Sequence, residues 1–254
     1  MLCIKNESAL KIMAEGGKIL SSCMIMLGDV LKPGMSTLEL DKIAHKYIID
    51  HGAKPSFLGL YGFPNTLCIS VNEEIIHGIP SAKKILKEGD LVSLDGGVLW
   101  KNFHTDMART YIVGGETTEE KKNLVERTKQ AFYEGMRFAR VGNRISDISH
   151  GVETYINRFG YGIVRDYVGH GVGRELHESP EIPNFGAPGH GPRIVNGMTL
   201  AIEPMINLGT HRVKVLKDGW TTVTCDGSCS AHYENTVAIV DGEPVILTDP
   251  DTAL

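Results

Sequence analysis

The sequence predicts an α+β fold made of two related halves. Two segments with helical apolar periodicity, residues 7–30 and 37–51, precede a series of short β-branched segments, and two more helical segments lie in the middle of the chain. No low-complexity linker divides the 254 residues, which suffice for one large domain. A repeated strand pattern indicates the two halves. We therefore expect residues 1–254 to form a single domain.

Individual signals delimit the elements. The first helix should end near Pro33 and Gly34, and Ser36 with Glu39 forms a capping-box pattern for the second. A strand is expected over residues 67–72. Two paired strands, 91–95 and 98–113, should follow, with Gly96 and Gly97 as the turn between them.

The second half begins with another capping-box pattern. Thr117 and Glu120 should open a helix that runs to about Arg140, and a further helix is expected over 146–159. From residue 160 onward glycine, proline and β-branched residues dominate, and they predict strands near 198–206, 211–216, 221–225 and 233–240.

Composition excludes several classes of protein. The chain is 42% hydrophobic and 22% charged, as in soluble globular proteins, and its net charge of −5 gives no basic surface for sequence-specific nucleic-acid binding. The longest early apolar run, residues 19–27, is too short and polar to span a membrane, and no export signal is evident. Five scattered cysteines suit reduced thiols, so we expect a cytoplasmic protein.

Two internal echoes relate the halves. Residues 86–95 align with 194–203, so that each strand ends on an acid, Asp95 or Glu203. Residues 104–106 align with 232–234, each triplet leading from a histidine to an acid, Asp106 or Glu234, and into a strand. The offsets are 108 and 128 residues, which an extra hairpin of about 20 residues in the second half would explain.

The four acids point to a metal centre. A single acid near a strand end is usually a solvated turn residue, but these acids adjoin apolar strands. Buried carboxylates cost several kcal/mol unless they are paired or bound to a cation, and four together cannot all ionise without a positive partner. Four carboxylates can bridge two divalent ions, which would lower the pKa of a shared water.

A histidine completes this candidate ligand set. His170 lies among three glycines, Gly169, Gly171 and Gly173, which let other backbone segments approach closely. A set rich in oxygen with one nitrogen suits Mn, Fe, Co or Zn as a working metal. The candidate ligands are Asp95, Asp106, His170, Glu203 and Glu234.

The order Asp, Asp, His, Glu, Glu resembles the methionine aminopeptidases of the pita-bread (creatinase/aminopeptidase) fold. Residues 72–80 (NEEIIHGIP), 169–178 (GHGVGRELHE) and 201–204 (AIEP) resemble family motifs, as do 218–221 (DGWT) and 230–236 (SAHYENT). The likeness covers about residues 5 to 248. It implies a curved, mostly antiparallel sheet covered by helices, in two pseudo-two-fold halves.

The resemblance also implies residue roles. Asp95 would chelate one ion, Asp106 and Glu234 would bridge both, and His170 with Glu203 would complete the other. Glu203 would also act as general base for the bridging water. His77 and His177 would bind the substrate amide and stabilise the oxyanion; without the resemblance, His77 reads as a loop histidine.

The implied activity is removal of the initiator methionine from nascent polypeptides whose second residue is small. Phe63, Cys68 and Trp220 would line an apolar methionine pocket. Two divalent ions (Co, Mn, Fe or Zn) are the implied cofactors. A cytoplasmic monomer is expected, and ribosome association is compatible with it although the sequence shows no obvious docking patch.

Some positions depart from the family pattern. Leu60 and Tyr61 stand where many bacterial relatives have Tyr and His, Phe63 replaces a Tyr, and Leu176 replaces an aromatic residue. Because these residues differ from the family pattern, the sequence does not determine which second substrate residues are accepted. His232 replaces a Gln; we expect it to support a ligand, with direct ligation at high metal left open.

The lengths indicate a subtype. Only 31 positions separate Glu203 from Glu234, so the helical insert of type II enzymes has no room. We also expect no zinc-binding N-terminal extension of the kind found in eukaryotic type I enzymes, so a short bacterial type I form fits best.

Two rival functions remain at this stage. A proline-specific peptidase of the same fold usually carries an extra N-terminal domain. A non-catalytic binding module would have lost ligands, whereas all five are present here.

Overall fold

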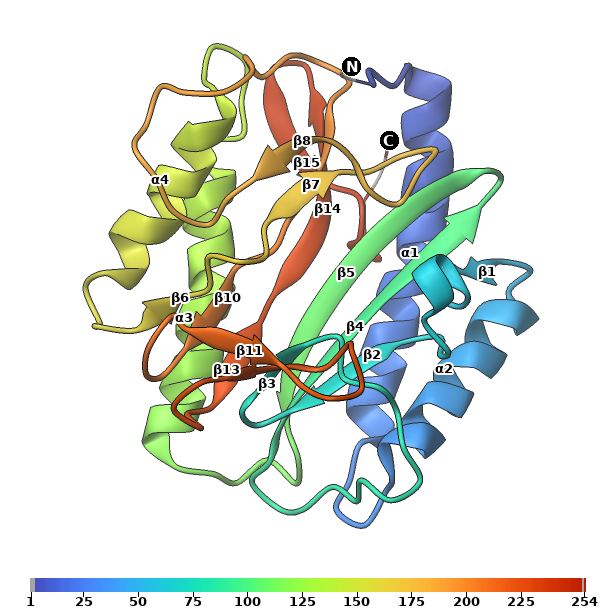
Figure 1. Cartoon of the computed structure of the whole chain (residues 1–254). Coiled ribbons are helices and arrows are strands. Elements are labelled where there is room, and N and C mark those ends of the chain that lie inside the picture. Colours follow the sequence, from blue (N-terminus) through green and yellow to red (C-terminus); the bar gives the residue numbers. More distant parts are fainter. Residues whose placement is uncertain (1–2, 253) are drawn as a thin grey trace.

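Four helices flank a curved antiparallel sheet in the computed structural model, which describes residues 3–252 and 254. Two helices lie on one side of the molecule and two on the other (Figure 1). None of the helices in the described residues is long and apolar enough to cross a membrane. The helices are α1 (Glu7–Val30), α2 (Thr37–Asp50), α3 (Glu119–Met136) and α4 (Ile145–Ile156).

The main sheet joins the two halves of the chain along one central pairing. Its strand order is β1-β4-β5-β14-β9-β7-β8, with β2 paired to β4 and β15 paired to β14. At the centre Glu234 lies opposite Ala108. The strands are β1 (Lys54–Pro55), β2 (Cys68–Val71), β4 (Leu91–Trp100), β5 (Phe103–Ile112), β7 (Gly169–Gly171), β8 (Glu178–Ile182), β9 (Thr199–Ile202), β14 (Glu234–Val240) and β15 (Glu243–Ile246).

The expected two related halves are confirmed by this order. Strands β4 and β5 form one antiparallel pair, β9 and β14 form the other, and β5 meets β14 between them. Four short strands lie between β9 and β14 in sequence, which accounts for the longer second offset of the echo. They are β10 (Met205–Asn207), β11 (Val213–Val215), β12 (Thr222–Thr224) and β13 (Ser230–His232).

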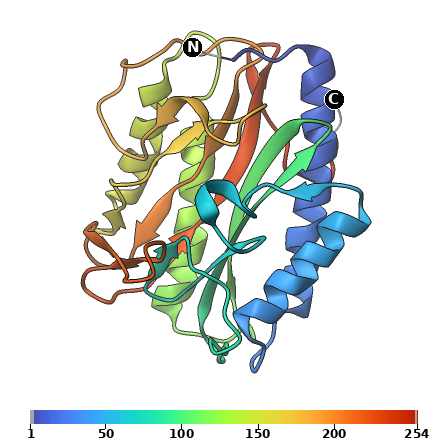
Figure 2. The same cartoon turned by 45° about the vertical axis from the view of Figure 1, so that its right-hand side comes forward.

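These four short strands belong to two small sheets. One has the order β13-β10-β6, and the other has the order β11-β12-β3. In Figure 1, β3, β11 and β13 lie low in the view, whereas β6 and β10 lie beside α3 at the left; Figure 2 shows the same chain turned by 45°. The remaining elements are β3 (Glu74–Ile76), β6 (Gly162–Ile163) and the short 3₁₀ helix η1 (Leu60–Gly62).

Alternation along the strands separates a helix-covered face from an open face. Val92, Leu94 and Val98 of β4 pack in one core cluster with Leu20 and Leu27 of α1. In the second half, side chains of β9 and β14 pack in the same way against α3 and α4, as members of a cluster that includes Phe132, Ile148, Leu200, Ile202, Val237 and Ile239. The intervening residues of each strand therefore point to the opposite face of the sheet.

The predicted turn at Gly96 and Gly97 is wrong. Strand β4 runs through both glycines, and the chain reverses at Lys101 and Asn102, whose φ angles are 46° and 66°. Two consecutive positive φ angles are the geometry of a tight two-residue hairpin. The glycines serve packing instead, because a Cβ on Gly96 would lie 2.3 Å from Cδ2 of buried Leu67.

Other boundaries also differ from expectation. The capping box of Ser36 and Glu39 is confirmed. The N-cap of α3 is Thr118, so the predicted capping residue Thr117 is wrong. The hydroxyl of Thr117 donates a hydrogen bond to the Gly89 carbonyl at 3.0 Å. Helix α3 ends at Met136, short of Arg140. The strand expected over 198–206 is interrupted between β9 and β10, where a proline lacks the N–H needed to continue a ladder.

Candidate active site

Strand register places the predicted ligands on the open face of the sheet. Asp95 lies opposite Ala108, and Gly97 lies opposite Asp106, so both acids share one face of the β4–β5 pair. Glu234 is also opposite Ala108, which extends this face across the seam to β14.

The same face continues through β9 to β7. Thr236, two residues after Glu234, lies opposite Ala201, and Ala201 also lies opposite His170. Glu203 follows two residues after Ala201, immediately beyond β9. The pairing pattern thus gathers all five predicted ligands from five different strands or strand ends.

The glycines beside His170 allow β7 to approach its neighbours. A Cβ on Gly169 would lie 2.3 Å from the carbonyl oxygen of Ala201, and one on Gly171 would lie 2.4 Å from that of Ser179. Side chains there would force β7 away from β9 or β8. The imidazole Nδ1 lies 2.8 Å from the Gly171 carbonyl, which leaves Nε2 directed toward the acids.

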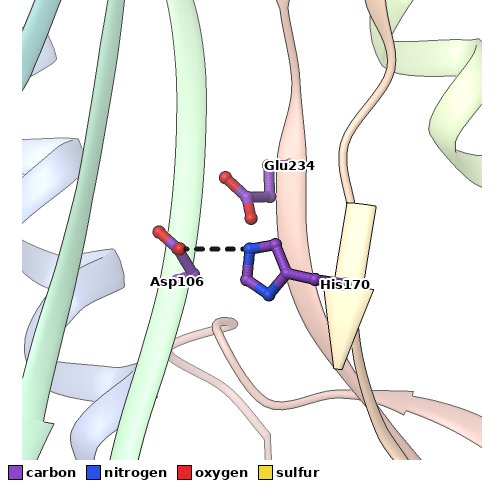
Figure 3. Close-up of side chains that lie close together, drawn as sticks. All are labelled: Asp106, His170 and Glu234. Carbon is purple, nitrogen blue, oxygen red and sulfur yellow. Dashed lines mark ion pairs between the residues drawn. The ribbon is translucent and has the colours of Figure 1, made fainter. Parts of the chain in front are cut away.

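The ligand atoms converge closely. One donor atom each from Asp106, His170 and Glu234 lies within 4.8 Å of the others (Figure 3). His170 Nε2 is 3.8 Å from Asp106 Oδ2 and 3.5 Å from Glu203 Oε1. Asp95 lines the same cavity and is 9% exposed. The side chains predicted from the sequence as ligands therefore lie close together in the fold.

Burial makes the acids reluctant to ionise. Desolvation raises the pKa of Asp106 to about 7. Desolvation, reinforced by the charge of Asp106, holds the pKa values of Asp95, Glu203 and Glu234 well above their usual range. Conversely, desolvation lowers the pKa of His170 to about 4, so its imidazole is neutral at pH 7 and offers a lone pair.

These residues fit a divalent cation. Asp95 Oδ1 and Glu234 Oε1 are buried, and neither has a hydrogen-bond partner among the described residues. The nearby guanidinium of Arg109 donates to the Glu234 backbone carbonyl and to Asn235 Oδ1, not to a carboxylate of the cluster. A bound cation would satisfy the orphaned oxygens and allow the acids to ionise together.

A cavity of about 530 Å³ connects these acids with an apolar pocket. Phe57, Phe63, Cys68 and Leu176 form a buried cluster at one side, and the Trp220 ring packs edge-on against Phe63 with centroids 5.2 Å apart. Cys68 lies directly opposite Asp95 across β2 and β4, so the pocket adjoins the acids.

Trp220 is held by a local turn. Asp218 Oδ1 accepts hydrogen bonds from the backbone N–H groups of Trp220 and Thr221, both at 2.9 Å. Gly219 between them has a φ of 78°, which suits glycine. The sequence DGW thus fixes the backbone that carries the indole.

Two further histidines face this cavity. His77 follows β3 with a φ of 59°, and His177 precedes β8. The His170 and His177 rings pack edge-to-face at 4.5 Å. Desolvation, with a smaller effect of His177, lowers the pKa of His77 to about 4, and desolvation also lowers the pKa of His177. Both predicted residues therefore line the cavity as neutral imidazoles at neutral pH.

Sequence reasoning missed Tyr167 in this cavity. Its ring packs edge-on against His77 at 5.4 Å, and its hydroxyl lies 2.8 Å from Thr222 Oγ1. It lies outside the strands, so no alternation pattern in the sequence marks it as facing the cavity. Tyr61, noted only as a departure, is stacked against His177 at the cavity wall with centroids 6.3 Å apart.

Comparison with known proteins places the chain. Residues 11–241 match the model of metallopeptidase family M24. The chain belongs to this family. A methionine aminopeptidase of Clostridium perfringens is 52% identical to this M24 member, covering 98% of this chain and 99% of the relative. Methionine aminopeptidase 1 of Bacillus subtilis is 47% identical with the same coverage. The resemblance read from the motifs is confirmed.

Solved structures confirm the pita-bread fold of this M24 member. The methionine aminopeptidase of Thermotoga maritima superposes with a TM-score of 0.96 at 42% identity, covering 98% of this chain and 100% of that one. A prolidase of Pyrococcus horikoshii matches with a TM-score of 0.79 at 23% identity, covering 98% of this chain but 64% of the prolidase. The prolidase likeness shows the fold alone.

Proposed function

We propose that this M24 metallopeptidase removes the N-terminal methionine from other proteins, with residues 1–254 acting as one catalytic domain. The observation that carries the proposal is the cavity that joins the carboxylate cluster to the pocket of Phe63, Cys68 and Trp220. An unbranched thioether fits an apolar pocket of this kind, and its burial contributes roughly 1.5–3 kcal/mol. Full-length relatives named methionine aminopeptidase support the choice.

Two divalent ions are the cofactors that we propose. Asp95 would hold one, Asp106 and Glu234 would bridge both, and His170 with Glu203 would hold the other. When bound, such ions lower the pKa of a water and polarise the scissile carbonyl. Mn, Fe, Co and Zn all suit this donor set.

The side chains around the ions have separate tasks. Glu203, 12% exposed at its side chain, would accept the proton of the attacking water and later deliver it to the leaving amine. His77 and His177, kept neutral by burial, would each donate an N–H to the substrate amide and its developing oxyanion. The apolar pocket would hold the methionine side chain and exclude water from it.

The proposed substrates are N-termini of nascent polypeptides with a small second residue, processed by a cytoplasmic monomer. The free amine would lie against the acidic cluster, which restricts cleavage to the first residue. Because nascent chains emerge from the ribosome, the enzyme would act near it.

Methionine release from a peptide panel tests this proposal. Chelated protein should be inactive, and added Mn²⁺ or Co²⁺ should restore cleavage of Met-Ala-Ser. Glu203→Ala should lose at least a hundredfold in kcat, whereas Glu126→Ala, which removes an exposed acid from α3, should not. Cleavage restricted to Xaa-Pro peptides would overturn the methionine assignment, and no metal-dependent cleavage of either kind would favour a binding module.

A further inference from the structure

The second imidazole beside the carboxylates is His232, which lies outside the five-ligand set. Building on the proposed dinuclear peptidase, we propose that His232 Nε2 is a sixth metal ligand. The centre would then present two imidazoles, with Glu203 between them.

Distances carry the first step. His232 Nε2 is 3.7 Å from Glu203 Oε2 and 4.0 Å from Glu234 Oε2. The other oxygen of Glu203, Oε1, is 3.5 Å from His170 Nε2. Each oxygen of this carboxylate thus faces a different imidazole. The backbone fixes this arrangement, because His232 on β13 lies directly opposite Met205, two residues beyond Glu203.

Burial carries the second step. His232 is 2% exposed, and neither of its ring nitrogens has a hydrogen-bond partner among the described residues. Buried side-chain nitrogens without a partner are rare in folded proteins. The imidazole nevertheless lines the cavity that contains the carboxylates. A cation between these groups would give Nε2 the partner that the protein does not supply.

The spacing is that of ligands sharing an ion. Donors bound to one Zn²⁺ at about 2.0–2.2 Å lie roughly 3–4 Å apart, depending on the angle at the metal. Hydrogen-bonded N–H···O atoms lie closer, at about 2.7–3.2 Å. Both carboxylate contacts of His232 fall in the first range and outside the second. The geometry therefore disfavours the support by hydrogen bonding that the sequence suggested for this residue.

The pseudo-symmetric histidine of the first half provides an internal comparison. His104 precedes Asp106 by two residues, as His232 precedes Glu234. Its Nδ1 lies 2.9 Å from Ser56 Oγ, and it is not among the residues lining the cavity. His104 in the first half has a hydrogen-bond partner, whereas His232 in the second half has none among the described residues and faces the carboxylates. His104 is therefore the matched control.

A second nitrogen donor should change the order of metal affinities. Imidazole favours Zn²⁺ and Co²⁺, whereas Mn²⁺ prefers carboxylate and water oxygens. Replacing His232 with Gln keeps a polar side chain of similar size but removes the imidazole. Zn²⁺ affinity should then fall at least about tenfold, and Mn²⁺ affinity should change much less.

The experiment titrates chelated wild type, His232→Gln and His104→Gln with Zn²⁺ and Mn²⁺ in competition with a chelating dye. Visible spectra of the Co²⁺-loaded proteins report the ligand field independently of activity. We expect a selective loss of Zn²⁺ affinity and altered Co²⁺ bands in His232→Gln alone. Unchanged affinities and bands, or equal losses for Zn²⁺ and Mn²⁺, would overturn ligation.

If His232→Gln does not fold, a second measurement on the wild type tests the same proposal. The ¹⁵N NMR spectrum of Zn²⁺-loaded wild type labelled at histidine should show metal-bound nitrogens from both His170 and His232; a signal from one histidine alone would refute the proposal. Wild type that cleaves methionine but shows one bound histidine leaves the proposed function standing. Wild type that binds no metal defeats both.

Discussion

In the metal-free protein, the unfolding free energy should depend on pH because the carboxyl of Asp106 is buried. Desolvation raises the pKa of this carboxyl from 3.8 to about 7. A folded-state pKa above the unfolded value contributes stability at low pH and loses it as pH rises through the folded value. Over pH 6 to 8 the folded carboxyl releases its proton while the unfolded one is already ionised. The unfolding free energy should therefore fall by roughly 1 kcal/mol from this group.

Comparison with Asp106→Asn separates the contribution of Asp106, together with its charge coupling to three neighbouring acids, from that of the other groups. The coupling acts in the same direction, because an ionised Asp106 makes Asp95, Glu203 and Glu234 costlier to ionise. Buried His77, His170 and His232 have lowered pKa values and act in the opposite sense, since they lose stability as pH falls. They are present in both proteins and cancel in the difference. Urea unfolding of both chelated proteins at pH 6 and pH 8 should show the wild type losing roughly 1 kcal/mol or more relative to the variant. A difference that is the same at both pH values would refute the reasoning, as would one that grows in favour of the wild type.

Three other substitutions test packing, pocket and capping. Gly169→Ala should lower the unfolding free energy by about 1–3 kcal/mol or more in chemical denaturation, because its Cβ would meet the Ala201 carbonyl; wild-type stability would contradict that contact. Leu176→Ala should raise KM for methionyl peptides about tenfold by removing a buried pocket wall, with kcat less affected in steady-state assays; an unchanged KM would exclude Leu176 from the pocket. Ser36→Ala should lower stability by about 1 kcal/mol in thermal or urea unfolding through loss of the α2 cap, whereas equal stability would show that the cap is dispensable.

Local signals predicted the helices well and the strand connections less well. Helix α1 begins and ends where its apolar period does, and the capping box of α2 forms as expected. Gly96 shows the limit of such reasoning. A glycine in a turn and a glycine under a packed side chain look alike in sequence, and the deciding neighbour, Leu67, lies 29 positions away.

The candidate ligands were accessible from sequence because apolar strands flank acids that should not be buried alone. The cavity around them was less accessible. Tyr167 reaches it from a loop and Tyr61 from the short 3₁₀ helix η1, and no periodicity marks which of these side chains face inward. The unsatisfied state of His232 likewise depends on every atom around it, whereas the sequence shows only that a histidine precedes Glu234.

The seam between β5 and β14 has a consequence for the maturation of the protein. Asp106 and Glu234 are 128 positions apart in the chain yet lie on adjacent strands at the carboxylate cluster. A chain of which only the first half has been made carries just two of the proposed donors, Asp95 and Asp106, so we expect it to bind a divalent cation weakly. We therefore expect metal binding to follow the docking of the two halves. Once the halves have docked, the donors already converge without an ion, so metal-free molecules should bind metal when it is added without refolding.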